Sequence, residues 1–241
     1  MKNIQKKGKR WELAQTYELN WWQKRKGGLR SEYYKHSAIE IRNYLEKEHR
    51  IISEETKILE VGSGMCGILT FLNESKSRFA IDPLEDYYSS VSEFVAKRDS
   101  SVMYYKAKGE NIPFENKTFD LIILDNVLDH CEDPVLVLDE INRVLGEKGI
   151  IYFRQNTYNC YGKFMRSLME LFIIDKGHPF TFTKRKLKRM FAKYDLKITH
   201  KNRIGYFPAW WGELTSKTIK DKIKAFLFIT RDKVTYVLRK N

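Results

Sequence analysis

The sequence predicts an α/β fold in which a mostly parallel sheet carries helices on both faces. From residue 57 onward, short apolar runs alternate with helical stretches, a pattern typical of parallel strands joined by crossover helices. The first of these runs is followed by three glycines within six residues, in "EVGSGMCG". A glycine-rich turn after a first strand is typical of doubly wound, Rossmann-like sheets that bind a nucleotide at that turn.

Strands and helices are expected to alternate over the first hundred residues of this region. The apolar runs predict five strands, at residues 57–61, 78–82, 101–107, 119–126 and 149–156. The stretches between them predict helices at 67–74 and 133–145, with a helix or irregular crossover at 87–98.

Two longer segments interrupt the pattern after the fifth strand. Residues 157–180 are aromatic-rich and longer than a median connection, which predicts a lid or a partly helical insertion. A helix at 183–194, with Thr183 as its cap, leads to a strand at 196–202. A second insertion follows at 206–229, and a last strand at 233–240 closes the sheet.

The N-terminal region reads as two amphipathic helices. Apolar and aromatic residues recur at helical spacing over residues 11–26, and again over 31–48. Ser31 is a plausible cap for the second helix, and Gly27 and Gly28 break the chain between the two.

The glycine-rich turn predicts an adenosine-containing ligand. Gly62, Gly64 and Gly67 form a G-x-G-x-x-G arrangement, which permits a tight turn, close backbone approach to a ligand and close helix–sheet packing. Asp82 lies at the end of the second strand, where a carboxylate can accept both hydroxyls of a ribose. The alternative for Asp82 is a turn former before Pro83.

Glu60 favours an amino-acid nucleoside over a nicotinamide dinucleotide. It lies two residues before Gly62, at the tip of the first strand, where its carboxylate can meet a cationic amino group. A pyrophosphate gains nothing from a negative charge at this point.

Residues ~57–156 resemble the class I S-adenosylmethionine-dependent methyltransferases, and within them the small-molecule group that includes the quinone-biosynthesis methyltransferases. The matching pieces are "LEVGSGMCG", "AIDP", "GENIPFENKTFDLI", "DNVLDHCEDP" and "EINRVLGEKGIIYF". The resemblance implies S-adenosylmethionine as the cofactor and in-line methyl transfer as the reaction. It also implies a seven-stranded sheet whose last strand runs antiparallel, with the cofactor at the carboxyl ends of the first four strands.

The resemblance further implies nine cofactor-binding positions. They are Glu60, Gly62, Ser63 and Gly64 for the methionine moiety, Asp82 for the ribose, Gly109 and Glu110 beside the adenine, and Asn126 and Val127 lining the site after the fourth strand.

The chain departs from the family pattern at two points. The family often has an acidic residue before the position of Gly109, where it meets the adenine amino group, and this chain has Lys108. A lysine cannot accept that hydrogen bond, so adenine recognition is expected to use the backbone, Glu110 or Asn111. The family also usually has two glycines at the end of the segment that reads "GEKGI" here, and this chain has only one at that point. Neither departure touches the loop expected to hold methionine.

A hydroxyl acceptor must lose its proton, and histidine is the usual base near neutral pH. His178, inside the first insertion, is the first candidate for this catalytic role, with a surface-loop histidine as the alternative. His130 is the second candidate, and the alternative is a structural histidine that bonds the following loop. His36 faces the site only if the N-terminal helices fold over it, and Asp125 and Asp129 are expected to be cap or loop residues.

Cysteine content and hydropathy bound the environment. The three cysteines are too few and too scattered for a disulfide framework or a zinc site, so reduced thiols and no metal are expected. No apolar run approaches the ~18 residues of a spanning helix, and the basic N-terminus lacks the apolar stretch of a secretory signal. These features predict a cytoplasmic protein and leave peripheral attachment at the inner membrane surface open.

The net charge of +13 is concentrated at the two ends of the chain. Residues 1–30 carry +7, residues 31–183 carry −7, and residues 184–241 carry +13. Such asymmetry suggests a phosphate-bearing substrate or an anionic membrane surface, and the alternative is a surface tuned only for solubility. The lysine-rich stretch 214–229 fits surface attachment or, equally, a packed helix whose lysines extend to solvent.

The identity of the acceptor rests on a weaker resemblance. "WELAQTYELNWWQ", "YYKHSAIEI", "IDPLEDYY" and "DKGHPFTFT" are similar to methyltransferases found with polysaccharide and glycolipid assembly. This favours O-methylation of a small molecule or of a glycan- or lipid-linked hydroxyl. Two alternatives stay open: an RNA or protein methyltransferase that uses the basic ends, and a cofactor-binding scaffold without chemistry.

The domain organisation expected from these segments has two parts. Residues 1–50 form an N-terminal helical cap, and residues 51–241 form the class I methyltransferase domain. The insertions fall at about 157–182 and 206–229.

Overall fold

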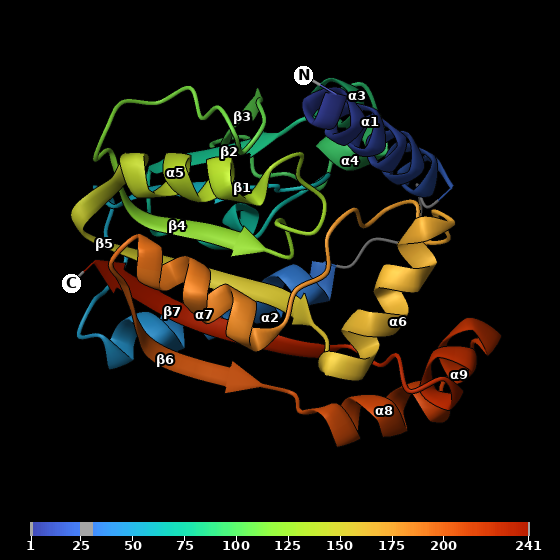
Figure 1. Ribbon diagram of the computed structural model, residues 1–241. Coiled ribbons are helices and arrows are strands. Elements are labelled where there is room, and N and C mark those ends of the chain that lie inside the picture. The colour runs from blue at the N-terminus through green and yellow to red at the C-terminus, as the bar shows by residue number, and fades with distance from the viewer. Residues whose placement is uncertain (1, 25–30, 241) are drawn as a thin grey trace.

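The computed structural model describes residues 2–24 and 31–240, and its centre is a seven-stranded sheet in the order β3-β2-β1-β4-β5-β7-β6 (Figure 1). All neighbouring strands from β3 to β5 are parallel, and β7 is antiparallel to both β5 and β6. The predicted sheet with one reversed last strand is therefore confirmed. The strands are β1 Lys57–Val61, β2 Ser77–Asp82, β3 Met103–Lys106, β4 Phe119–Asp125, β5 Leu145–Thr157, β6 Leu196–Arg203 and β7 Asp232–Lys240.

Helices cover both faces of the sheet and its carboxyl end. They are α1 Lys2–Gln23, α2 Ser31–Lys47, α3 Glu85–Ser89, α4 Ser92–Val95, α5 Pro134–Val144, α6 Cys160–Leu171, α7 Lys184–Lys193, α8 Tyr206–Leu214 and α9 Ile219–Phe226, with a 3₁₀ turn η1 at Leu69–Phe71.

The core has two layers, one on each face of the sheet. On one face, α5 and α7 bury Ile141 and Phe191 against β1, β4 and β5. On the other face, α2 buries Ile41 and Leu45 beside η1. Alternate residues of the central strands serve the two layers, so Leu59 belongs to the first and Ile58 to the second. The strands are apolar on both sides because both faces are covered.

One predicted helix is wrong. Residues 67–74 form only the short turn η1, not a helix. Gly67 and β2 are separated by nine residues, and the carboxylate of Glu60 binds the amides of Ile68 and Leu69 at the start of the turn. The side chain of Arg42 on α2 then donates to the carbonyl oxygen of Phe71. On this face of the sheet, α2 therefore packs where a longer helix at 67–74 was expected.

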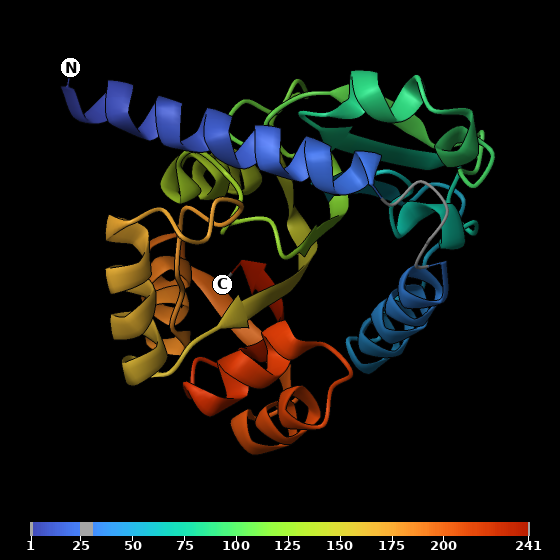
Figure 2. The same ribbon diagram turned by 90° about the vertical axis from the view of Figure 1, so that its right-hand side faces the viewer.

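The N-terminal helix α1 is longer than predicted and lies across the carboxyl ends of the strands (Figure 2). Gly27 and Gly28, the predicted break, lie outside the described residues. The segment 157–182 contains α6, and 206–229 contains α8 and α9; in Figure 2 these helices border the same end of the sheet as α1. Within residues 2–24 and 31–240, no helix has the length and apolarity needed to cross a membrane.

Candidate active site

A cavity of about 1250 Å³ opens at the carboxyl ends of β1, β2, β4 and β5. Its walls include residues of α1, α2, α6 and α9. The nine predicted cofactor-binding positions and the two candidate bases all line this cavity, although they come from segments more than a hundred positions apart. They are Glu60, Gly62, Ser63, Gly64, Asp82, Gly109, Glu110, Asn126, Val127, His130 and His178.

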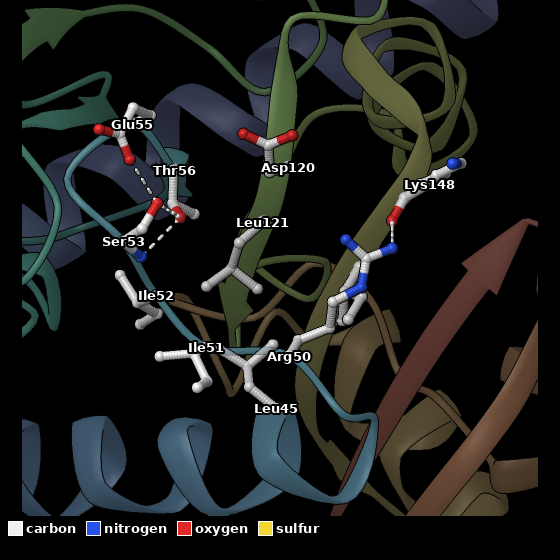
Figure 3. Close-up of a pocket in the computed structure, with 11 residues that line it drawn as sticks. Leu45, Arg50, Ile51, Ile52, Ser53, Glu55, Thr56, Asp120, Leu121 and Lys148 are labelled. Atoms are coloured by element: carbon white, nitrogen blue, oxygen red, sulfur yellow. Dashed lines mark hydrogen bonds between the residues drawn. The ribbon is translucent and has the colours of Figure 1, made fainter.

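A smaller cavity of about 290 Å³ lies at the opposite end of the strands (Figure 3). There Arg50 donates to the carbonyl oxygen of Lys148, and the carboxylate of Asp120 accepts the amide of Lys57. No predicted site residue lines it. In a parallel α/β sheet ligands bind at the carboxyl ends of the strands, so the larger cavity is the candidate site.

The glycine loop needs residues without side chains for two separate reasons. Gly62, Gly64 and Gly67 all have positive φ, at 71°, 63° and 80°, where L residues are strained. A Cβ on Gly62 would lie 2.8 Å from a methyl of Val127, and a Cβ on Gly67 would lie 2.7 Å from the carboxylate of Glu60. Val127 and Glu60 therefore pack closely against the loop, and the backbone of Gly62 to Gly64 is exposed to the cavity.

Asp82 reaches across the crevice to this loop. One carboxylate oxygen accepts the amide of Gly64 at 2.9 Å, and the other accepts the amide of Leu84 at 2.9 Å. Burial and the neighbouring Glu18 raise its pKa to about 7, even though both amides favour the ionised form. A carboxylate has about four lone-pair directions, so the two that remain can accept hydroxyl groups.

Glu60 lies beneath the loop. Its two oxygens accept the amides of Ile68 at 2.9 Å and Leu69 at 3.1 Å, and the residue is 2% exposed. Burial raises its pKa to about 8 against the effect of these two hydrogen bonds. Glu60 thus shapes the loop through its hydrogen bonds, and a cationic group bound above it would favour its ionised form.

Gly109 and Glu110, the residues predicted to lie beside an adenine, make close contacts with other parts of the chain. A Cβ on Gly109 would lie 3.2–3.3 Å from Val61 and Val137, so this glycine permits close packing of β1 against α5. The carboxylate of Glu110 accepts the amides of Glu132 and Asp133 just before α5.

Lys108, the departure from the family pattern, turns toward the N-terminal helix. Its ammonium lies 3.0 Å from the carboxylate of Glu132 and 3.7 Å from the ring centroid of Trp11 on α1. It therefore helps hold α1 against the protein, at the edge of the same cavity.

Asn126 joins the ends of β4 and β5. It has φ 61°, a conformation that asparagine tolerates better than most residues. Its side-chain oxygen accepts from the amide and side chain of Asn156 and from Gln155. These bonds fix the loop that carries Val127 under the glycine turn.

The helix α1 covers part of the cavity, and the side chains through which it does so were not among the predicted site residues. Trp11, Gln15, Glu18 and Trp22 line the cavity from one stripe of α1. A Cβ on Gly64 would lie 3.4 Å from Trp22. The helical spacing of these residues was visible in the sequence, but the surface that they face could not be assigned.

His178 forms a hydrogen-bonded pair with Asp175. The ring Nδ1 lies 2.9 Å from Asp175 Oδ1, and Arg166 is ion-paired with the other oxygen of the same carboxylate. Burial alone would raise the pKa of Asp175, but His178 and Arg166 outweigh it and hold that pKa well below its usual range. An ionised carboxylate only accepts, so in the neutral ring Nδ1 carries the proton and Nε2 is the acceptor.

His130 has a different environment although its ring centroid lies only 4.5 Å from that of His178. Its Nδ1 lies 3.2 Å from the carboxylate of Glu18. Burial lowers its pKa, but Glu18 and Asp129 outweigh burial and raise it to about 9. His130 is therefore a cation near neutral pH, in contact with the covering helix.

His36, which could have faced the site if the N-terminal helices fold over it, does not line the cavity. The helix α2 does border the cavity, but His36 lies on its exposed side. The inward side presents Tyr33, whose hydroxyl donates to Asp125 Oδ2 at 2.6 Å, and Ser37, which is buried. Tyr33 and Ser37 lie four residues apart and therefore share one face of α2.

Asp125 was expected to be a cap or loop residue, and it lines the cavity instead. Its Oδ2 lies 3.6 Å from Arg154, and its Oδ1 is buried without a hydrogen-bond partner among the described residues. A buried carboxylate oxygen without a donor is costly, and a cationic or hydroxyl-bearing ligand would satisfy it.

One group of side chains has spacing that could hold a metal ion. The ligand atoms of Asp129, His130 and His178 lie within 4.8 Å of one another. Asp129 already accepts from Gln155 at 2.7 Å, and each histidine has a carboxylate at Nδ1. Each of the three side chains is therefore already in contact with a protein partner.

Comparison with known proteins agrees with this geometry. A family profile described as "Methyltransferase domain" matches residues 59–153. A protein of Methanocaldococcus jannaschii, MJ1123, is 33% identical over 66 residues, which cover 27% of this chain and 31% of that protein. YrhH of Bacillus subtilis is 28% identical over 109 residues, which cover 44% of this chain and 61% of YrhH. The chain thus spans about a third and about three-fifths of these two relatives.

Solved structures of methyltransferases share the fold. The geranyl diphosphate C-methyltransferase of Streptomyces coelicolor, in complex with Mg²⁺, geranyl diphosphate and S-adenosyl-L-homocysteine, superposes with a TM-score of 0.63 at 12% identity, over 90% of this chain and 87% of that one. The matched profile assigns residues 59–153 to a methyltransferase domain, and the structural likeness shows that the chain has the fold of these enzymes.

Proposed function

We propose that the protein transfers a methyl group from S-adenosylmethionine to a hydroxyl of a small molecule or of a glycan- or lipid-linked acceptor. The observation that carries the proposal is the His178–Asp175 pair, which offers a base in the same cavity as the glycine loop and Asp82. We also propose that residues 1–50 act as the cap of this cavity and residues 51–241 as the domain beneath it, with insertions at about 157–182 and 206–229 forming the acceptor wall.

The cofactor half of the cavity fits a cationic amino-acid nucleoside. Carboxyl groups of Glu60, Asp82 and Asp125 line its floor, and a bound cation would favour their ionised forms. Glu18 adds a further carboxylate from α1. Gly62, Ser63 and Gly64 would hold the methionine moiety, Asp82 the ribose, and the segment around Gly109 the adenine. When bound, S-adenosylmethionine supplies a methyl group on a sulfonium that is already activated for transfer.

The acceptor half has a different lining. Met165 and Met169 come from α6, and Ile219 and Ile223 come from α9. Basic residues stand among them, including Lys220, Arg231 and Lys233. This mixture suits a molecule with an apolar part and an anionic group. The Streptomyces structure, which holds an apolar chain bearing a diphosphate, supports an acceptor of this kind.

The base in this proposal is His178. Nε2 would take the proton of the acceptor hydroxyl while Asp175 stabilises the resulting imidazolium through Nδ1. His130, already protonated, would contribute a fixed positive charge beside it. The helix α1 would exclude water, which keeps these interactions strong and protects the methyl donor from hydrolysis.

The test is a methyl-transfer assay with radiolabelled S-adenosylmethionine against a panel of hydroxyl acceptors, from free sugars to polyprenyl-phosphate-linked sugars. We expect transfer to at least one lipid- or glycan-linked hydroxyl, with no loss after dialysis against a chelator. Tight cofactor binding with no transfer to any acceptor would favour the scaffold alternative.

RNA is the second candidate acceptor, and the charge of +13 on residues 184–241 motivates it. A gel-shift titration with structured RNA at physiological salt separates the two, because phosphate-driven binding weakens steeply as salt rises. Binding that survives physiological salt, together with label transfer to RNA, would replace the hydroxyl proposal.

A further inference from the structure

Two helices on the rim of the cavity expose apolar stripes to solvent. On α6, Phe164, Leu168 and Leu171 follow the i, i+4, i+7 spacing of one helix face and are 41–75% exposed. On α9, Ile219, Ile223 and Phe226 follow the same spacing and are 53–77% exposed. An amphipathic helix of a globular protein normally turns such a stripe toward the core.

The residues after each helix extend these stripes. Phe172 and Ile174 follow α6, and Phe228 follows α9; all three are more than half exposed. Contiguous exposed apolar surface of this kind marks an interaction site rather than a free surface.

The two stripes border the same opening. Met165, Met169 and Ile174 line the cavity from the side of α6, and Ile223 and Leu227 line it from the side of α9. Figure 2 shows both helices at the same end of the molecule, around the carboxyl ends of the strands. The apolar surface is therefore the lip of the acceptor entrance.

A small acceptor in the cavity would leave most of this surface uncovered. Phe164, Leu171, Phe172 and Phe226 do not line the cavity. These side chains need a larger, extended apolar partner.

Positive charge surrounds the same lip. Lys163 lies on α6, and Lys217, Lys220 and Lys222 lie on or just before α9; all four are exposed. Among the residues that the structure describes, none of the four is ion-paired with a carboxylate. A symmetric contact between two copies would bring these lysines against one another, which disfavours a second copy as the partner.

We propose that α6, α9 and the segments that follow them form a surface that docks on an anionic lipid bilayer, with the cavity opening onto the membrane. The apolar stripes enter the boundary between headgroups and acyl chains, and the lysines meet the anionic headgroups. The inference rests on the proposed function only in naming what enters, a hydroxyl-bearing lipid-linked acceptor; the docking itself does not depend on it.

The test is vesicle flotation of the full chain. Vesicles of equimolar phosphatidylcholine and phosphatidylglycerol should retain the protein about 10²-fold better than vesicles of phosphatidylcholine alone, since each lysine near an anionic surface contributes about 1 kcal/mol. The double variant Leu171→Ser/Phe226→Ser should lose binding to the mixed vesicles by about 10²-fold or more, because it removes one anchor from each stripe.

The matched control is Ile51→Ser, at an apolar side chain that is 87% exposed beside the smaller cavity (Figure 3). It should bind vesicles as the unaltered protein does. No flotation with mixed vesicles, equal flotation of the double variant, or a dimer by light scattering that the double variant dissolves would each overturn the docking proposal.

The two proposals fail in separable ways. Vesicle binding without methyl transfer to any lipid-linked hydroxyl removes the proposed function and leaves the docking surface. Transfer to such an acceptor in detergent, without vesicle binding, removes the docking surface and leaves the proposed function.

Discussion

The two halves of the cavity are built in different ways. In the cofactor half, strand ends and tight turns bond one another: Asp82 holds Gly64, and Glu60 holds the start of η1. In the acceptor half, side chains of α1, α6 and α9 meet across the opening, and many of them end in solvent. The difference teaches that a short motif can specify the first half locally, whereas the second half depends on which helices fold against it.

The largest effect on the cofactor half of the cavity is expected from a substitution at Gly62. Gly62→Ala places a Cβ 2.8 Å from Val127 at a φ of 71°, where the strain costs about 1–3 kcal/mol. We expect cofactor binding to fall below detection in calorimetry, because the loop must shift. The matched control is Gly212→Ala on α8, where a Cβ meets nothing within 4 Å and binding should not change.

A substitution in the acceptor half should lower the turnover number and leave the affinity for the cofactor unchanged. His178→Ala should lower the turnover number by ~10²-fold or more, with cofactor affinity kept, because it removes the proton acceptor alone. His36→Ala, at an exposed histidine of α2, is the control. Unchanged turnover in His178→Ala, measured on the acceptor found in the transfer assay, would exclude this histidine as the base.

The cofactor half should also show a pH-dependent affinity. The pKa of Asp82 is raised to about 7 and that of Glu60 to about 8, and a bound cation favours their ionised forms. We expect affinity for S-adenosylmethionine to rise by about tenfold as pH goes from 6 to 8, with proton release at pH 7. Calorimetry in buffers of different ionisation enthalpy measures the released protons; a flat profile would contradict the raised pKa values.

The smallest effect is expected where α1 contacts the base region. In Glu18→Gln the pKa of His130 should fall from about 9, because the variant loses the carboxylate that raises it most while Asp129 still opposes burial. Ring proton NMR titration measures this shift, with Glu12→Gln, an exposed glutamate of α1, as the control. The stability contributed by the raised pKa of His130 is complete below about pH 6.5 and is lost as pH rises through about 9.

Much of the fold could be read from the sequence because its signals are local. The strand β1 and the reversed β7 follow from apolar runs and a family resemblance, and the structure has both. The helix expected at 67–74 fails because propensity in that segment competes with Glu60 and with the cover that α2 provides. Tertiary contacts of this kind leave no mark in a short window of sequence.

The site residues also divide into those that a local sequence signal predicts and those that depend on tertiary contacts. The positions of Gly62, Gly64 and Asp82 around one cavity could be predicted, since strand ends of a parallel sheet meet at one edge. Glu18, which raises the pKa of His130, could not, because it lies on α1 and meets His130 only when that helix packs over the site. Asp175 and His178 are only three residues apart, so their contact could have been predicted from the sequence. Their position at the cavity could not be predicted from this spacing.

The most direct test of the account is a calorimetric titration of the protein and of Asp82→Ala with S-adenosylmethionine and S-adenosylhomocysteine, with Asp86→Ala as the exposed control. The account predicts micromolar binding, on the order of 7–8 kcal/mol, in the unaltered protein and the control, and its loss in Asp82→Ala. Binding of NADH in place of both nucleosides, or undiminished affinity in a folded Asp82→Ala variant, would contradict it.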